Sequence, residues 1–337
     1  MAESLAVNVG IILLATVGIY IGSGWLEQSS DTLSSYYGLP LVVQGAIVAA
    51  VGSSFPELAS VVFSALSGSF GLGVGAIVGS AIFNILVIPA LSGIVTHDDI
   101  ESSRTLVYKE AQFYMIAVSV VVITFAMAVI YYPIDGMALM GDVTRPLAVM
   151  PLALYGLYIF IQYADTADYE AEPVTDVNVL RQWGTLVAGL IVILVSVEQL
   201  VHAIQFIGDV YGAPDFLWGI TVLAAATSLP DTLVSVRAAK DGRGVTSLAN
   251  VLGSNTFDLL VAIPIGVLIV GEATINFAIA VPTMGFLTLA TVLLFTALRT
   301  DLSLTGREAY GLLVTYVGFV LWMIAETADL TNFIPGA

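Results

Sequence analysis

The sequence predicts an all-α polytopic membrane protein with ten transmembrane helices, in two inverted five-helix repeats with broken helices at the midplane. Three observations support this fold class. Of 337 residues, 58% are hydrophobic and 10% are charged, and apolar runs of about 20 residues recur throughout, which soluble domains do not tolerate. Two segments 174 residues apart repeat the same Gly, Ser and Pro positions. Each segment carries an acidic residue directly after Ser-x-Pro, inside an apolar run.

Ten apolar segments are long enough to cross a bilayer. The expected spans are 6–25, 38–67, 70–95, 107–131, 146–163, 182–204, 214–239, 244–270, 276–298 and 308–325. The first span lacks the basic start and the short apolar core of a cleavable signal peptide. The chain is therefore expected to divide into a first repeat at 1–165, an acidic cytoplasmic linker at 166–181 and a second repeat at 182–337.

The nine basic residues set the expected orientation in the membrane. With the N-terminus outside, only Arg145 lies outside, and the other eight lie at cytoplasmic ends or loops, which satisfies the positive-inside rule. An even number of spans then leaves both termini outside. We expect a multi-pass protein of the cell inner (plasma) membrane, with the lipid bilayer as its surroundings. The eight are Arg104, Lys109, Arg181, Arg237, Lys240, Arg243, Arg299 and Arg307.

The net charge of −17 argues against a nucleic-acid partner, because the few basic residues are accounted for by topology. Acidic residues on both predicted surfaces indicate either a solvated face or a protein from a high-salt cytoplasm, where net charge maintains solubility. The lack of cysteine excludes disulfides and thiolate metal sites. No enzymatic activity and no cofactor are expected.

The repeat is an internal duplication. Its matches fall on Gly, Pro, Ser and polar positions, whereas chance similarity between apolar helices gives scattered Ala, Leu and Val. No gap is needed over more than forty residues, so Glu57 to Asn84 and Asp231 to Asp258 are both 27 residues apart. The first half has five spans, an odd number, so the second half enters the membrane inverted. Matched pairs include Gly45/Gly219, Ser54/Ser228, Pro56/Pro230, Gly79/Gly253, Ser80/Ser254 and Phe83/Phe257.

The two Ser-x-Pro segments predict where helices break. Pro56 and Pro230 have no N–H and clash with the carbonyl four residues earlier, which frees backbone oxygens. Irregular backbone at membrane depth is tolerated only where it is buried in protein or lines a cavity. Freed carbonyls beside a carboxylate form an oxygen-only cluster, which suits hard cations such as Ca²⁺ and Na⁺. The affected carbonyls are those of Gly52, Ser53, Ala226 and Thr227.

A second polar cluster lies on the following span of each half. Ser80 and Asn84, like Ser254 and Asp258, are four residues apart, so each pair shares one helix face. Inverted packing is expected to bring these residues to the acidic breaks. The cluster contains no His or Cys, which argues against zinc or copper. The expected set is Glu57, Asn84, Asp231 and Asp258 with the hydroxyls of Ser54, Ser80, Thr227, Ser228 and Ser254.

These segments resemble the two α-repeats of the cation/Ca²⁺ exchanger superfamily, specifically its Na⁺/Ca²⁺ exchanger branch. The family pattern is G-[ST]-S-x-P-[ED] followed by G-S-N-x-x-[ND], and the specific residues lie in about 45–92 and 219–266. Residues 78–84 and 227–231, with Phe257 and Asp258, look most like K⁺-dependent exchangers, and prokaryotic Na⁺/Ca²⁺ exchangers are similar as well.

The resemblance implies a secondary antiporter that exchanges Na⁺ for Ca²⁺ by alternating access, with Ca²⁺ extrusion as the natural direction and K⁺ co-transport left open. It implies Ca²⁺ ligands at Glu57, Asp231 and the carbonyls of Ser53 and Thr227. One flanking Na⁺ site is implied at Glu57, Ser80, Thr227, Ser228 and the Ala224 carbonyl. Its mirror image is implied at Asp231, Ser254, Ser53, Ser54 and the Ala50 carbonyl. Asn84 and Asp258 would complete a central position for Na⁺, water or K⁺.

Three positions depart from the family pattern. Ser53 replaces the usual Thr and keeps the hydroxyl and carbonyl. Ala81 replaces the more frequent Asn, as is typical of the K⁺-dependent branch. Asp231 is one methylene shorter than Glu57, so the site cannot be symmetric.

Charge balance favours exchange over conduction. With Glu57, Asp231 and Asp258 ionised, three Na⁺ neutralise the site, as does Ca²⁺ with K⁺. Ca²⁺ alone leaves one negative charge, which is costly or takes up a proton. A Ca²⁺/H⁺ antiporter of the same superfamily remains an alternative, although its usual G-N-x-x-E-H motif is missing here. A passive cation channel is a more remote alternative, and an intramembrane aspartyl protease lacks its G-x-G-D motif.

Overall fold

The computed structural model describes residues 2–38, 50–96, 99–104, 106–164, 177–212, 215–328, 330–331 and 333. Helices form almost all of it, including three π-helical segments, and four short strands complete it. The elements are α1 (Ala2–Tyr36), α2 (Ala50–Ser53), α3 (Phe55–Leu66), α4 (Phe70–Thr96), β1 (Ile100–Glu101), η2 (Leu106–Glu110), α5 (Ala111–Tyr131), β2 (Met140–Thr144), α6 (Arg145–Ala164), α7 (Val179–Tyr211), α8 (Asp215–Trp218), η3 (Gly219–Leu223), α9 (Ala224–Thr227), α10 (Leu229–Lys240), α11 (Gly244–Phe257), η4 (Asp258–Ala262), α12 (Ile263–Val270), β3 (Glu272–Asn276), α13 (Phe277–Arg299), β4 (Ser303–Leu304) and α14 (Gly306–Thr327).

The predicted helical polytopic architecture is confirmed in this part of the chain. Eight helices are long and apolar enough to cross a membrane, and a bent pair, Asp215–Thr227 with Leu229–Lys240, makes a ninth candidate span. The second expected span, 38–67, lies partly outside the described residues, because 39–49 are not described. The short strands were not predicted, since each lies in a connection between long helices.

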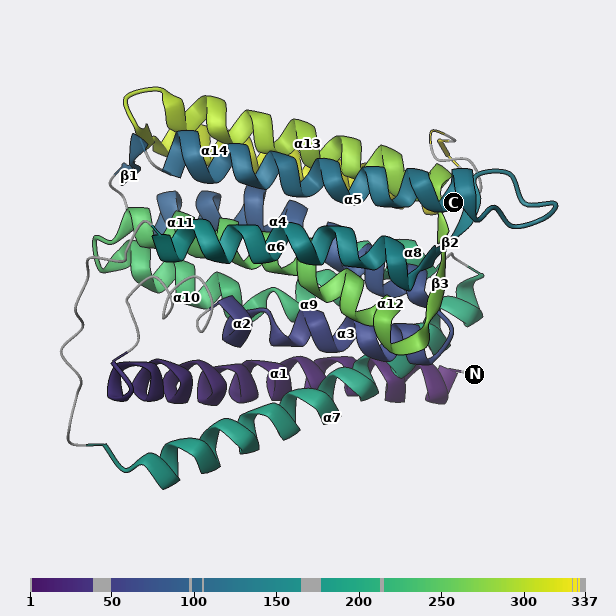
Figure 1. Cartoon of the computed structure of the whole chain (residues 1–337), viewed down its shortest axis with the longest axis horizontal. Helices are drawn as coiled ribbons and strands as arrows, with labels where there is room; N and C mark the ends of the chain where they lie inside the picture. The colour runs from purple at the N-terminus through teal and green to yellow at the C-terminus, as the bar shows by residue number, and fades with distance from the viewer. Residues whose placement is uncertain are drawn as a thin grey trace.

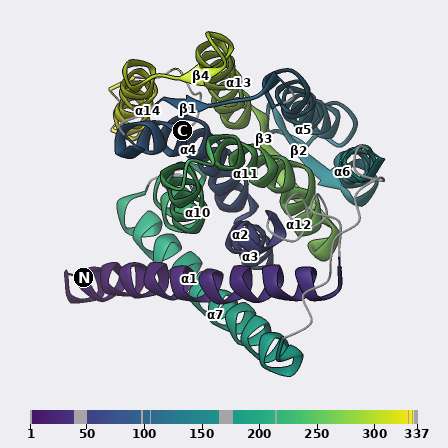
Figure 2. The same ribbon diagram turned by 90° about the vertical axis from the view of Figure 1, so that its left-hand side faces the viewer.

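The helices form an elongated bundle in which α4 lies at the centre (Figure 1). α4 is apolar on all sides and buried along most of its length, as a helix enclosed by other helices must be. α1 and α7 cross each other along one side of the bundle, and α13 and α14 lie on the opposite side (Figure 2). In contrast to the buried α4, α1 leaves many apolar side chains exposed, as expected of a helix that faces lipid.

Two small antiparallel sheets tie the connections together at opposite ends of the bundle (Figure 1). At one end β1 pairs with β4, with Ile100 opposite Leu304. At the other end β2 pairs with β3, with Val143 opposite Ala273. Each sheet therefore joins a strand from the first half of the chain to one from the second half.

Glycines let α4 approach the π-helical segment η3 closely. A Cβ on Gly79 would overlap the carbonyl oxygen of Ile220, and one on Gly75 would overlap that of Phe216. Gly219 on η3 is in turn packed against the α4 backbone at Leu72. Small residues at a helix interface permit this backbone approach in membrane proteins. The contact fixes α4 against the helix that leads to the second break.

We expect Gly79→Ala to destabilise the protein by about 1–3 kcal/mol, the usual cost of forcing an extra methyl into a packed site. Gly71→Ala is the matched control, because a Cβ there has nothing within 4 Å. The thermal unfolding temperature of the purified protein in detergent measures both. Equal losses in the two variants would contradict the close packing at Gly79.

Both predicted helix breaks are present. Ser54 separates α2 from α3, and Ser228 separates α9 from α10. In each case the proline lies in the first turn of the following helix, where its missing N–H costs nothing. The second break bends the chain by 47°. The backbone thus places an acidic residue, Glu57 or Asp231, in the first turn after each break.

Candidate cation-binding site

The two breaks meet α4 and α11 inside the bundle and form one buried polar cluster. Ser53 is only 2% exposed, and the other predicted polar side chains are fully buried. Ala224 is buried as well, while Ala50 is the first residue of α2 and its side chain lies outside the described part. The fully buried polar residues are Ser54, Glu57, Ser80, Asn84, Thr227, Ser228, Asp231, Ser254 and Asp258.

Ser80 of α4 links the first acidic residue to the second break. Its hydroxyl lies 2.6 Å from that of Ser228 and donates to Glu57 Oε1 at 3.5 Å. Thr227 lies beside Glu57, but its hydroxyl also donates to the carbonyls of its own helix, 3.3 Å from Ala224 O. The Ala224 carbonyl additionally accepts the N–H of Ser228 at 3.0 Å. The Ala224 carbonyl oxygen is therefore already a hydrogen-bond acceptor within its own helical segment.

Ser254 of α11 makes the corresponding link in the other half. Its hydroxyl donates to Asp231 Oδ1 at 3.1 Å and lies 3.2 Å from the hydroxyl of Ser53. Ser80 thus contacts both Glu57 and Ser228, and Ser254 contacts both Asp231 and Ser53.

The two halves differ at the next polar position. Asn84 donates from Nδ2 to Asp231 Oδ2 at 3.1 Å, so that carboxylate has amide and hydroxyl donors. The repeat partner of Asn84 is Asp258, which brings a second negative charge toward Glu57 instead of a donor. Ser54 faces Asp258 without a close hydrogen bond. Both oxygens of Asp231 thus accept from protein donors, whereas in the described residues Glu57 Oε2 and both Asp258 oxygens do not.

Five buried oxygens in the cluster have no hydrogen-bond partner in the described part of the chain. Leaving a buried carboxylate without a partner is costly, because it loses its hydration and gains nothing in exchange. Carboxylate, hydroxyl and amide oxygens are the ligands that hard cations take. The cluster therefore has the chemistry of a cation site. The oxygens are Ser54 Oγ, Glu57 Oε2, Asn84 Oδ1 and both carboxylate oxygens of Asp258.

The acidic side chains of the cluster are spread out. In the described residues, no three His, Cys, Asp or Glu side chains are close enough to hold one metal ion together. Glu57, Asp231 and Asp258 lie within electrostatic range of each other, with serine hydroxyls and Asn84 between them. An ion in this cluster would be bound by one or two carboxylates and several neutral oxygens.

Asn255 and Tyr114 belong to the cluster and were missed as site residues. Asn255 is fully buried, accepts from Asn84 at 3.0 Å and donates to the Tyr114 hydroxyl at 3.3 Å. The sequence feature that could have indicated Asn255 is an amide side chain inside an apolar span, directly after Ser254. Nothing in the sequence indicated a site role for Tyr114, because a tyrosine in span 107–131 is typical of a packing residue or an interfacial anchor.

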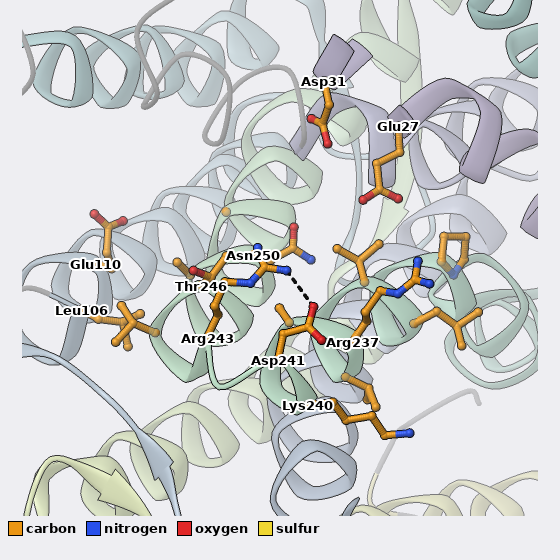
Figure 3. A pocket seen from close by; sticks show the side chains of 18 of the residues that line it. Glu27, Asp31, Leu106, Glu110, Arg237, Lys240, Asp241, Arg243, Thr246 and Asn250 are labelled. Carbon is orange, nitrogen blue, oxygen red and sulfur yellow. Dashed lines mark hydrogen bonds and ion pairs between the residues drawn. The ribbon is translucent and has the colours of Figure 1, made fainter. Parts of the chain in front are cut away.

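A cavity of about 1000 Å³ lies beside the cluster. It ends against Pro230 and Gly253, each the sequence neighbour of a cluster residue. Glu27 and Asp31 extend into it from α1, opposite Arg237 of α10 (Figure 3). Asp231 itself does not line the cavity and is fully buried.

The chain is similar to known proteins over most of its length. The family model described as "Sodium/calcium exchanger protein" matches residues 7–164 and 181–325. The uncharacterized membrane protein MJ0091 of Methanocaldococcus jannaschii is 29% identical over 82% of this chain and 87% of its own length. The sodium/calcium exchanger MaX1 of Methanosarcina acetivorans is 24% identical over 94% of this chain and 98% of its own. A structure of the sodium-calcium exchanger NCX_Mj, soaked with Na⁺ and Sr²⁺, covers 94% of this chain and 98% of its own with 25% identity and a TM-score of 0.63.

Proposed function

Because the chain belongs to the sodium/calcium exchanger family, we propose that it exchanges Na⁺ for Ca²⁺ across the membrane by alternating access. The observation that carries the proposal is the set of unpartnered buried oxygens around Glu57 and Asp258. Ca²⁺ and Na⁺ compete for the same carboxylates, so neither crosses together with the other. With an inward Na⁺ gradient the exchange extrudes Ca²⁺.

The proposed ligands follow the contacts in the cluster. Ca²⁺ lies between Glu57 and Asp231, with the carbonyls of Ser53 and Thr227 beside it. Na⁺ takes the two flanking positions instead, and a central position involves Asn84 and Asp258. The hydroxyl contacts support the flanking positions, because they gather oxygens around each carboxylate. The flanking sets are Glu57, Ser80, Thr227, Ser228 and Ala224 O, and Asp231, Ser254, Ser53, Ser54 and Ala50 O.

The architecture we propose is ten spans in two inverted repeats, at 1–165 and 182–337. The order of elements supports it, because each half continues from its acidic break through a long span, a strand, a helix, a strand and a last helix. The equivalent strands β1 and β3 lie at opposite ends of the bundle, as inversion requires (Figure 1). The site then lies where the two breaks face each other, near the middle of the membrane.

The cavity is the proposed cytoplasmic access route, since Arg237, Lys240 and Arg243 line it and the positive-inside rule places them inside. The chain contains no cysteine, so single cysteines report accessibility without background. We expect Thr246→Cys, in the cavity wall, to react with a membrane-impermeant thiol reagent in inside-out vesicles and not in right-side-out ones. Its repeat equivalent is the fully buried Leu72, and Leu72→Cys is the unreactive control. Labelling of Thr246→Cys only from outside would reverse the orientation.

The exchange itself is tested by uptake of radioactive Ca²⁺ into proteoliposomes loaded with Na⁺ and diluted into Na⁺-free medium, with and without K⁺. Uptake that requires internal Na⁺ supports the proposal, and stimulation by K⁺ adds co-transport. Uptake driven by a pH gradient and indifferent to Na⁺ would replace it with Ca²⁺/H⁺ antiport. Flux that needs no counter-ion would indicate a passive channel.

A further inference from the structure

The side chain of Asn255 is held by three partners on two helices, Ala81 and Asn84 on α4 and Tyr114 on α5. Its amide nitrogen donates to the Ala81 carbonyl at 3.2 Å and to the Tyr114 hydroxyl at 3.3 Å. Both N–H bonds of the amide are thereby used. Its oxygen is left to face Asn84, whose nitrogen donates to it at 3.0 Å. The orientation of the Asn255 amide is therefore fixed by donors and acceptors on both sides.

Asn84 is oriented in turn by two acceptors. Its nitrogen donates to Asn255 Oδ1 and to Asp231 Oδ2, at 3.0 and 3.1 Å. A flipped Asn84 amide would set its oxygen against both of these oxygens and lose two hydrogen bonds. The Asn84 oxygen is consequently directed away from them, is buried and has no hydrogen-bond partner among the described residues. It joins the unpartnered oxygens of Glu57 and Asp258 as an available ligand.

We propose that Asn255, held by Tyr114, is a positioning residue that fixes the Asn84 carbonyl oxygen toward the transported cation. This inference rests on the proposed exchange function and adds to it a residue that touches no ion. Without an acceptor at Asn255, only Asp231 Oδ2 holds the Asn84 N–H₂ group. The amide then turns its N–H₂ group toward the cation more readily, and the cation repels it.

The repeat explains why only one half of the chain has such a positioning residue. Position 255 is equivalent to position 81, where the chain has alanine. The Asn255 amide donates to the carbonyl of that same Ala81, so the two equivalent positions lie against each other. The small side chain at Ala81 leaves room for a single amide to reach across. Asn84 thereby gains a fixed orientation, whereas its equivalent Asp258, a carboxylate, has no amide to orient.

The test is a double-mutant cycle on Ca²⁺ binding, read from the Ca²⁺-dependent rise in unfolding temperature of the purified full chain in Na⁺-free detergent solution. We expect Asn255→Ala to weaken Ca²⁺ affinity by about tenfold, the lower end of the loss typical when a partner that orients a metal ligand is removed. In an Asn84→Ala background the same substitution is expected to change affinity less than about twofold, since the group that Asn255 orients is gone. Thr256→Val is the control, because the neighbouring Thr256 hydroxyl bonds only its own helix at Leu252 and should leave affinity unchanged.

An equal loss in both backgrounds, or no loss in the first, would overturn the inference. If Asn255→Ala does not fold, Tyr114→Phe takes its place in the cycle, because it removes one anchor of the Asn255 amide and leaves the cluster intact. Unchanged affinity in Tyr114→Phe would then overturn it. Failure of Ca²⁺ to stabilise the unsubstituted chain would instead refute the exchanger proposal, and the inference with it.

Discussion

Replacement of Glu57 by glutamine is expected to abolish Na⁺-driven Ca²⁺ uptake. The Glu57 carboxylate is fully buried, and its Oε2 has no hydrogen-bond partner in the described residues, so a cation is its proposed counter-charge. Glutamine removes that charge and offers an N–H₂ group in its place. Breaking a buried ionic contact by removing one partner costs about 3–5 kcal/mol. This loss corresponds to more than about a hundredfold in Ca²⁺ affinity.

Asp231→Asn is expected to be nearly as damaging, although Asp231 has more donors. Ser254 and Asn84 both donate to its carboxylate, so an asparagine there loses charge and must also reorganise its hydrogen bonds. Uptake of radioactive Ca²⁺ into Na⁺-loaded proteoliposomes measures both variants against the unsubstituted chain.

Glu326→Gln is the matched control for both substitutions. Glu326 is also buried, but its carboxylate accepts from Trp322 and Thr331 near the end of α14. Its substitution should leave uptake intact. Substantial uptake by Glu57→Gln, at a protein level equal to that of the control, would remove Glu57 from the proposed Ca²⁺ site.

The parts of the fold that the sequence predicted are those that single residues enforce. Proline lacks an N–H wherever it is placed, so Pro56 and Pro230 located the breaks at Ser54 and Ser228 without knowledge of packing. The constant offset of the repeat then paired each break with the correct serine: Ser80 and Ser254 contact Glu57 and Asp231. Local chemistry and the repeat were sufficient to predict these contacts.

The remaining features depend on tertiary contacts that leave no periodic pattern. Tyr114 comes from a span with no repeat signal, and only the packing of α5 against α11 brings it to Asn255. The cavity lies between side chains of α1, α10 and α11, an arrangement that composition does not encode. The spacing of Glu57, Asp231 and Asp258 also depends on packing, because serine hydroxyls and Asn84 lie between them.

Asp258 is the position where the two halves of the site differ most in charge. Its repeat equivalent, Asn84, donates a hydrogen bond to Asp231, whereas Asp258 has two unpartnered oxygens near Glu57. An additional positive charge is required on this side whenever Ca²⁺ is bound alone. In the proposed cycle that charge comes from K⁺, or else from Na⁺ or a proton.

Asp258→Asn is therefore expected to retain Na⁺-driven Ca²⁺ uptake and to remove its stimulation by K⁺. An asparagine at 258 can donate to Glu57 as Asn84 donates to Asp231, and the remaining two carboxylates balance Ca²⁺ without another ion. If uptake by the unsubstituted chain does not depend on K⁺, Asp258→Asn should move one fewer Na⁺ per Ca²⁺. Measuring the net charge transported per Ca²⁺ tests this stoichiometry.

Asn84→Asp is the reciprocal variant, since it adds a carboxylate against Asp231 and should increase the demand for a second cation. K⁺ stimulation that persists unchanged in Asp258→Asn would place the additional ion elsewhere, because a site built on the Asp258 charge cannot survive its removal.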